Sequence, residues 1–180
     1  GQTTAFIGST GSGKSTLINL IPRFYDVTDG CIKVNGTDIR NISQHRLHEQ
    51  VGYVPQKGVL LSGTIDSNLR YGRPDASDEE IREAAAVAQA TDFIEKKEDG
   101  FNALIAQGGT NVSGGQKQLL NLAAVMAMHP SLLILDEPTS QLDPIAASDF
   151  LETVKKINRD IGTTVLLTEH RLQDIIPYAD

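Results

Sequence analysis

The sequence has no tryptophan, a single cysteine and only two methionines among its 180 residues. A lone Cys31 cannot form a disulfide within the chain, which excludes a disulfide-stapled scaffold and fits a reducing compartment. No apolar run approaches the roughly 18 residues that a membrane-spanning helix requires. Stability must therefore come from an ordinary hydrophobic core, and 39% hydrophobic residues are enough to build one domain.

Basic residues are also in the minority, because 16 Lys and Arg stand against 23 Asp and Glu, a formal net charge of −7. A broad nucleic-acid surface would need a basic patch, so we expect no nucleic-acid partner. A local phosphate site stays compatible with this charge, since a few backbone N–H groups can hold an anion on an acidic protein.

Short apolar runs alternate with helical patterns along the chain. Where Gly and Pro bound such a run, it predicts a buried strand, and the stretch over 62–128 is mostly helical. This alternation predicts an α/β fold with a mostly parallel sheet and an inserted α-helical subdomain. The predicted strands cover 4–7, 31–34, 51–54, 132–135 and 164–168, and the predicted helices cover 14–21, 77–88, 115–128 and 144–161. Ser77 and Glu80 form a predicted capping box, and Gly162 ends the last helix. That helix is predicted to bury Ala147, Phe150, Leu151, Val154 and Ile157.

The strongest motif is a glycine- and hydroxyl-rich loop between a predicted strand and a predicted helix. It matches the phosphate-binding loop of P-loop NTPases in full, and its context makes an accidental glycine-rich turn the weaker reading. Backbone N–H groups of such a loop form an anion nest, Lys14 reaches the β- and γ-phosphates, and the Ser15 hydroxyl ligates Mg²⁺. The predicted nucleotide site comprises Gly8, Ser9, Thr10, Gly11, Ser12, Gly13, Lys14, Ser15 and Thr16.

Two carboxylates follow the apolar strand over 132–135, at the strand end where α/β proteins bind their ligands. We expect Asp136 to hold the Mg²⁺ shell and Glu137 to polarise an attacking water. Neighbouring strand residues point to opposite faces, so the pair can serve two roles. Without the phosphate loop, these residues would read as the polar end of a routine strand.

A third motif, Val112-Ser113-Gly114-Gly115-Gln116, begins a predicted helix and offers free amides and a hydroxyl to an anion. Here the chain resembles the ABC ATPase family, whose signature is Leu-Ser-Gly-Gly-Gln, with Val112 in place of Leu. The other family motifs follow in order over essentially the whole chain: Gln56 after Tyr53-Val54-Pro55, Ser140-Gln141-Leu142-Asp143 after the carboxylates, and His170 after the last strand.

The resemblance implies a P-loop NTPase (RecA-like) core and roles for these matched residues. The signature residues Ser113, Gly114, Gly115 and Gln116 would contact the ATP that a partner's phosphate loop holds, so a complete site would need two chains placed head to tail. Gln56 would contact Mg²⁺ and the attacking water and would transmit the state of the site to a transmembrane partner. His170 would contact the γ-phosphate, and Asp143 would lie at the dimer seam.

Each of these residues also has an ordinary reading when it is taken singly. Gln56 is then a loop amide, His170 a surface or core histidine, and Asp143 a helix cap with Pro144 at the first helical position. The stretch 57–61 is either a docking surface for a membrane partner's helix or an internally packed segment. The remaining histidines have no partner at metal-ligand spacing and are predicted to be structural: His45, His48 and His129.

Against the family pattern, the chain is predicted to be a single ABC ATPase domain over 1–180, truncated at both ends. The core would cover 1–61 and 129–180, and the helical subdomain about 62–128. The family's adenine-stacking aromatic residue would lie upstream of Gly1, and Tyr25 is not placed to replace it.

The chain also resembles two branches of the family. Exporter-like segments lie before about residue 117, and segments like those of energy-coupling-factor or cobalt-type importers lie after it. This predicts a mosaic chain. The exporter-like segments are Ser62-Gly63-Thr64-Ile65 and Asn68-Leu69-Arg70-Tyr71-Gly72, and the importer-like segments are Lys117-Gln118-Leu119-Leu120-Asn121-Leu122 and Thr168-Glu169-His170-Arg171-Leu172.

The predicted function is binding and hydrolysis of Mg-ATP at the cytoplasmic face of a membrane, to power transport. The predicted catalytic residues are Glu137, His170, Lys14 and Gln56, and the predicted metal ligands are Ser15, Gln56 and Asp136. The partners implied by the resemblance are a second nucleotide-binding domain and a transmembrane domain. Two alternatives stay open, a fragment that binds nucleotide without turnover and an ABC ATPase that serves DNA repair or translation.

Overall fold

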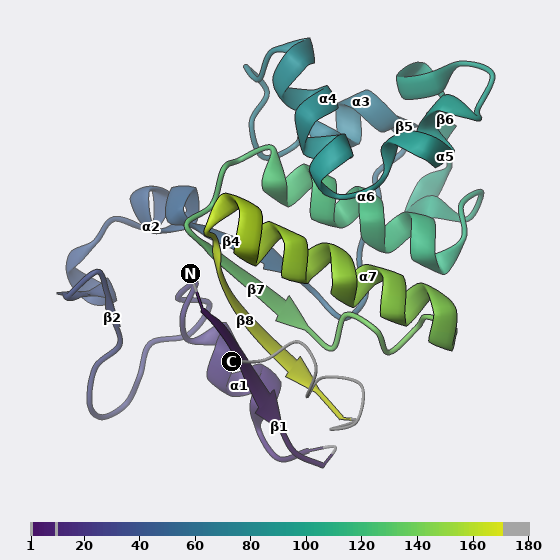
Figure 1. The fold of residues 1–180 in the computed structure, drawn as a ribbon. Helices are drawn as coiled ribbons and strands as arrows, with labels where there is room; N and C mark the ends of the chain where they lie inside the picture. Colours follow the sequence, from purple (N-terminus) through teal and green to yellow (C-terminus); the bar gives the residue numbers. More distant parts are fainter. Residues whose placement is uncertain (1, 10, 171–180) are drawn as a thin grey trace.

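A four-stranded parallel sheet forms the centre of the computed structural model, which describes residues 2–9 and 11–170 (Figure 1). The strands lie in the order β1, β8, β7, β4, so chain segments far apart in sequence are neighbours. All three pairings are parallel, and they place Asp136 beside Thr168 and Ile7 beside Glu169. The strands are β1 (Thr3–Ile7), β4 (Val51–Val54), β7 (Leu132–Asp136) and β8 (Thr164–Glu169).

Alternate residues of the central strands pack into two different cores. On β7, Leu133 and Leu135 join the larger core, whereas Ile134 joins the smaller core on the opposite face. This alternation follows from the pleat of a strand, and it explains why β7 is apolar at consecutive positions.

The smaller core is covered by the segments that follow β1 and precede β4. Helix α1 (Lys14–Asn19) contributes Ile18, and helix α2 (Gln44–Gln50) contributes Leu47. Between them lies a hairpin of β2 (Lys33–Val34) and β3 (Thr37–Asp38), and a 3₁₀ turn (Ile39–Asn41) leads into α2. The hairpin turns at Asn35 and Gly36, both at positive φ, as this residue pair favours.

The opposite face carries the two longest helices, α6 (Gly114–Met126) and α7 (Pro144–Lys156). Helix α7 begins as the sequence predicts, because the Asp143 carboxylate accepts hydrogen bonds from two amides of its first turn and Pro144 opens the helix. It continues into a π-helical turn (Ile157–Ile161) that ends at Gly162, in the left-handed conformation. The predicted core face is confirmed, since Ala147, Phe150, Leu151, Val154 and Ile157 are all buried.

The region between β4 and α6 is mostly helical, as predicted. Its helices are α3 (Ile65–Leu69), α4 (Asp78–Val87) and α5 (Thr91–Glu95), with 3₁₀ turns at Gly100–Asn102 and Gln107–Gly109. A small two-stranded antiparallel sheet pairs the ends of this region, β5 (Gly63–Thr64) with β6 (Leu104–Ile105). The predicted capping box of Ser77 and Glu80 is present at the start of α4.

The predicted α/β class, parallel sheet and helical insertion are confirmed, and element ends shift by one or two residues. Helix α1 ends at Asn19 and α6 at Met126, each two residues early, whereas the strand predicted from Cys31 begins at Lys33. One hydrophobic core joins α4 and α6 to β7 and β8, so the helical region and the sheet share buried residues. In the described part of the chain, no helix has the length and apolar character to cross a membrane.

Candidate functional site

The glycine-rich loop leaves the carboxyl end of β1 and enters α1. Gly11 and Gly13 have φ of 79° and 88°, the left-handed conformation that glycine adopts most readily. At Gly8, a Cβ atom would lie 2.6 Å from Oγ of Ser12, so a side chain there would force the Ser12 side chain to move. The loop is therefore shaped by three glycines, as a phosphate nest requires. Ser9, Ser12 and Thr16 are exposed, and Thr10 lies outside the described residues.

Lys14 folds back over this loop instead of extending into solvent. Its ammonium donates hydrogen bonds to the carbonyl oxygens of Gly8, at 2.7 Å, and Ser9, at 3.2 Å. It also lies 3.8 Å from Oε1 of Glu137, and the residue is buried. The buried Lys14 ammonium thus points into the loop, where it could contact the oxygens of a bound phosphate, as the lysine of a P-loop protein does.

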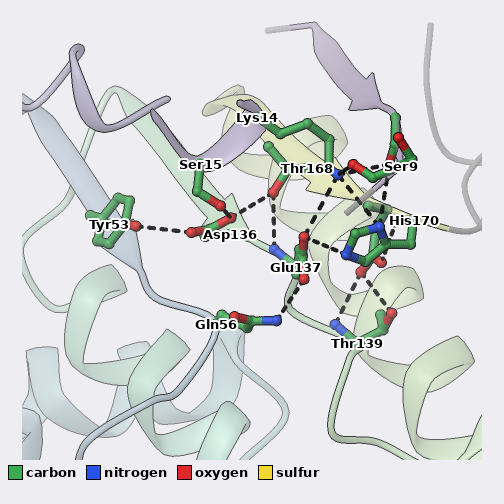
Figure 2. Close-up of polar contacts among 12 residues, drawn as sticks. Ser9, Lys14, Ser15, Tyr53, Gln56, Asp136, Glu137, Thr139, Thr168 and His170 are labelled. Carbon is green, nitrogen blue, oxygen red and sulfur yellow. Dashed lines mark hydrogen bonds and ion pairs between the residues drawn. The ribbon is translucent and has the colours of Figure 1, made fainter. Parts of the chain in front are cut away.

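The buried carboxylate of Asp136 accepts three hydrogen bonds from hydroxyl groups (Figure 2). Ser15 donates to Oδ1 at 3.0 Å and Thr168 donates to the same oxygen at 2.8 Å, whereas Tyr53 donates to Oδ2 at 3.3 Å. Burial, together with the Asp136 carboxylate, raises the pKa of Tyr53 well above its usual range, so the phenol stays protonated and donates.

Glu137 lies at the centre of a second set of contacts (Figure 2). Its Oε1 lies 2.6 Å from Nε2 of His170, and its Oε2 accepts a hydrogen bond of 2.6 Å from the Gln56 amide. Nδ1 of His170 lies 3.2 Å from the carbonyl oxygen of Gly8 and 3.4 Å from Nζ of Lys14. The four residues predicted to be catalytic therefore meet in one cluster beside the loop.

One step of the sequence reasoning was wrong. Glu137 is not a strand residue, because β7 ends at Asp136 and Glu137 has φ of 45°. The two carboxylates take different partners because the chain turns at Glu137, and not because of strand alternation. A non-glycine residue in the left-handed conformation costs free energy, and such strain gathers at functional sites.

The donor set beside the loop fits a magnesium ion. The Ser15 hydroxyl and the Asp136 carboxylate lie 3.0 Å apart, so one cation could bind both oxygens. Gln56 is held beside Glu137 through its amide nitrogen, which leaves its carbonyl oxygen as a further possible ligand. Among the described residues, no separate group of His, Cys, Asp and Glu has metal-site geometry.

The predicted signature residues lie at the start of α6. Ser113 forms a capping box with Gln116, and both Ser113 and Gly114 are exposed. A Cβ atom on Gly114 would lie 3.1 Å from the carbonyl oxygen of Gln141, so the signature packs closely on the segment before α7. Gly115 lies against Ala146, and Asp143 caps α7. Between described residues, no hydrogen bond or ion pair joins this surface to the phosphate loop.

Sequence reasoning gave no role to Tyr53 or Thr168. Tyr53 precedes Gln56 by three residues and Thr168 precedes His170 by two. A polar side chain this close to a predicted site residue, near the end of a strand, could have indicated that both belong to the site. The remaining histidines make local contacts. His48 lies 2.8 Å from the carbonyl oxygen of Pro22, and His45 and His129 face Glu49 and Glu80.

Comparison with known proteins agrees with this geometry. The family model described as "ABC transporter" matches residues 1–140. Proteins of Staphylococcus aureus, strains COL and N315, whose names describe multidrug export ATP-binding/permease proteins, are each 45% identical over 175 residues. That match covers 97% of this chain and 30% of each relative. It runs across residue 117, and the mosaic origin stays a prediction.

A solved structure gives the same assignment. The structure of a bacterial Atm1-family ABC exporter with ATP bound has a TM-score of 0.87 and 36% sequence identity. The match covers 97% of this chain and 30% of the exporter chain, so the chain spans about a third of the length of the proteins it matches. The P-loop fold, the loop with its buried lysine and the matching relatives lead to one conclusion: this chain is an ATP-binding domain of the ABC transporter family.

Proposed function

We propose that this chain binds and hydrolyses Mg-ATP at a membrane's cytoplasmic face and thereby powers transport through a transmembrane partner. The observation that carries the proposal is the cluster in which His170 and Gln56 hold opposite oxygens of Glu137 beside the buried ammonium of Lys14. A binding site alone has no need of a carboxylate fixed from two sides, whereas hydrolysis needs a group that orients water.

Phosphate binding is assigned to the loop. The Lys14 ammonium donates hydrogen bonds to the carbonyl oxygens of Gly8 and Ser9, and phosphate oxygens would replace these oxygens as its acceptors. Ser15, Asp136 and Gln56 would hold Mg²⁺, which supplies positive charge that neutralises the phosphates. The Tyr53 and Thr168 hydroxyls would fix the Asp136 carboxylate in the orientation that this task requires.

Hydrolysis is assigned to Glu137 and its neighbours. Glu137 would accept a hydrogen bond from the attacking water, while His170 and Gln56 fix the direction of its two oxygens. Catalysis of phosphoryl transfer rests on positioning and charge stabilisation, and this site offers both without a covalent step.

A complete site is proposed to need a second nucleotide-binding domain. Ser113 and Gly114 are exposed and have no hydrogen bond to the described residues of their own phosphate loop, although the amides of a helix start can bind an anion. Two domains placed head to tail would each give a signature to the partner's ATP, with Asp143 at the seam. The core would then comprise 1–61 and 129–180, with 62–128 as a helical subdomain.

A groove of about 300 Å³, lined in part by Tyr53 and Pro55, is the proposed contact for the transmembrane partner. Val59 and Tyr71, at its rim, are 65% and 73% exposed, whereas Leu60 is buried. The stretch 57–61 is thus partly packed and partly free. Because Pro55, the residue before Gln56, lines this apolar groove, a partner's helix end bound there could respond to the state of the site.

Complementation between two inactive variants tests the shared site. Lys14→Ala disables the phosphate loop, and Ser113→Asn keeps a helix cap but removes the signature hydroxyl. Each variant alone should hydrolyse almost no ATP. An equal mixture should recover about a quarter of the unsubstituted rate, because half of the randomly formed dimers are mixed and each has one intact site of two.

Ser77→Asn is the matched control, because it makes the same change in the capping box of α4. It should leave hydrolysis unchanged. A mixture no more active than its two components would reject the head-to-tail site. ATP binding without any turnover in the unsubstituted chain would favour the alternative of a binding module, and unaltered turnover in Lys14→Ala would reject the assigned phosphate site.

A further inference from the structure

Glu169 is a buried carboxylate that the mechanism above does not use. Its Oε1 accepts two hydrogen bonds from Thr139, one from the backbone N–H at 3.1 Å and one from the hydroxyl at 2.6 Å. Its Oε2 accepts a weaker hydrogen bond from the backbone N–H of His170 at 3.3 Å. The exposed fractions of Glu169 and Thr139 are 4% and 1%.

We propose that Glu169 is a positioning residue that fixes the segment after Glu137 and thereby aligns Glu137 with His170. The inference rests on the proposed ATPase function. Glu169 itself would touch neither ATP nor the attacking water, and it would act through Thr139 and the backbone of His170.

The cost of burying a carboxylate supports a specific role. A buried charge requires compensation by a cation or by several hydrogen bonds. In residues 2–9 and 11–170, Glu169 forms no ion pair, so its compensation there comes from the three donors of Thr139 and His170. A small apolar residue could fill the end of β8 without this cost, and departures from local rules concentrate at functional sites.

The position of Glu169 in β8 explains what it can align. Thr168, the residue before it, accepts the Glu137 N–H with its carbonyl and hydroxyl oxygens, each at 3.1 Å. His170, the residue after it, contacts the Glu137 carboxylate. Thr168 therefore holds the backbone of Glu137 and His170 holds its carboxylate, while Glu169 between them holds Thr139, two residues after Glu137. The left-handed backbone conformation of Glu137 needs such support.

The segment that Glu169 contacts is also hydrogen-bonded to α6, the helix that begins with the signature residues. The Leu142 N–H donates to the carbonyl oxygen of Thr139, and Gln118 of α6 donates to the carbonyl oxygen of Pro138 at 3.1 Å. The segment between Glu137 and α7 is thus held by β8 on one side and by the signature helix on the other. Loss of the Glu169 contact should loosen this segment at the end that adjoins Glu137.

Two isosteric substitutions test the role, each with a matched control. Glu169→Gln places an amide donor against donors, and Thr139→Val removes the hydroxyl while it keeps the shape. Each should lower kcat about tenfold, since a small misplacement of a catalytic group costs up to about 100-fold. The Kd for ATP should change less than about twofold, because Glu169 has no hydrogen bond to the described phosphate loop. Glu98→Gln, at an exposed glutamate, and Thr139→Ser, which keeps the hydroxyl, should both retain kcat.

Two further measurements separate alignment from general stability. Combining Glu169→Gln with His170→Ala should lower kcat little more than His170→Ala alone, since the two changes disturb one arrangement. Amide hydrogen exchange should rise at Thr139 and Ser140 in Glu169→Gln and stay unchanged in the middle of α7.

The outcomes distinguish this inference from the proposed function. An unsubstituted protein without ATP hydrolysis would overturn the proposed function and the catalytic part of this inference, while hydrogen exchange would still test the contact. Active protein with unchanged kcat in both Glu169→Gln and Thr139→Val would overturn the positioning role alone. The positioning role would also be overturned if the effects of Glu169→Gln and His170→Ala on kcat were fully additive, or if amide hydrogen exchange at Thr139 did not change in Glu169→Gln.

Discussion

Nε2 of His170 lies 2.6 Å from Oε1 of Glu137, although the two residues are 33 positions apart in sequence. They meet because β7 and β8 are adjacent parallel strands, whose carboxyl ends lie at one edge of the sheet. The phosphate loop leaves β1 at the same edge, since β1 is the other neighbour of β8. Gln56 follows β4, which pairs in parallel with β7, so the parallel order of all four strands brings the predicted catalytic residues to one place.

Glu137→Gln should bind ATP nearly as well as the unsubstituted protein and lose at least about 100-fold in kcat, which is the scale of general-base catalysis. Glutamine keeps an oxygen that can accept the Gln56 hydrogen bond, but it cannot accept a proton from water. Steady-state hydrolysis and equilibrium ATP binding would measure the two effects. Turnover near the unsubstituted rate would remove Glu137 from its assigned role.

Tyr53→Phe should raise the Mg²⁺ concentration that gives half-maximal hydrolysis by about tenfold, the lower end of the effect of losing an outer hydrogen bond to a metal ligand. The substitution removes only the hydroxyl that donates to Oδ2 of Asp136. Hydrolysis titrated with Mg²⁺ at fixed ATP measures the change. Tyr25→Phe, at an exposed tyrosine, is the control, and an equal response in both variants would contradict a special role for Tyr53.

Glu80→Gln should make the free energy of unfolding depend less on pH in the acid range. The Ser77 N–H, the Ser77 hydroxyl and Arg73 lower the pKa of Glu80 to about 2 from its usual 4.5. Because the folded pKa is depressed, the contribution is complete above about pH 4.5 and is lost as pH falls toward 2. Urea unfolding between pH 7 and 3 should show the two proteins converging as pH falls. A parallel shift of the two curves at all pH values would contradict the linkage.

Gly52→Ala should lower the free energy of unfolding by about 1–3 kcal/mol, the usual cost of overpacking a core. A Cβ atom on Gly52 would lie 2.3 Å from Cγ1 of Val125 and 3.0 Å from Cγ of Pro130, so β4 could not approach α6 as closely. Denaturant unfolding measures the loss. The cost should be smaller in a Val125→Ala background, and an equal cost there would show that Val125 is not the obstacle.

The elements that local patterns describe were predicted well. Asp143 and Pro144 start α7, Ser77 and Glu80 start α4, and Gly162 ends the turn after α7, because caps and glycine conformations act over a few residues. Apolar runs located the four strands of the main sheet. The ends of α1 and α6 were less certain because a frayed last turn changes few contacts.

By itself, the sequence determined the phosphate loop, the strand that leads into it and the identities of the polar residues at the strand ends. These depend on local backbone conformation and on periodicity. The tertiary structure decided which polar residues meet. It placed the Tyr53 hydroxyl on Asp136, gave Glu137 its left-handed turn and buried Glu169 against Thr139. Parallel pairing in register brings together residues that lie far apart in the chain, and no local pattern carries that register.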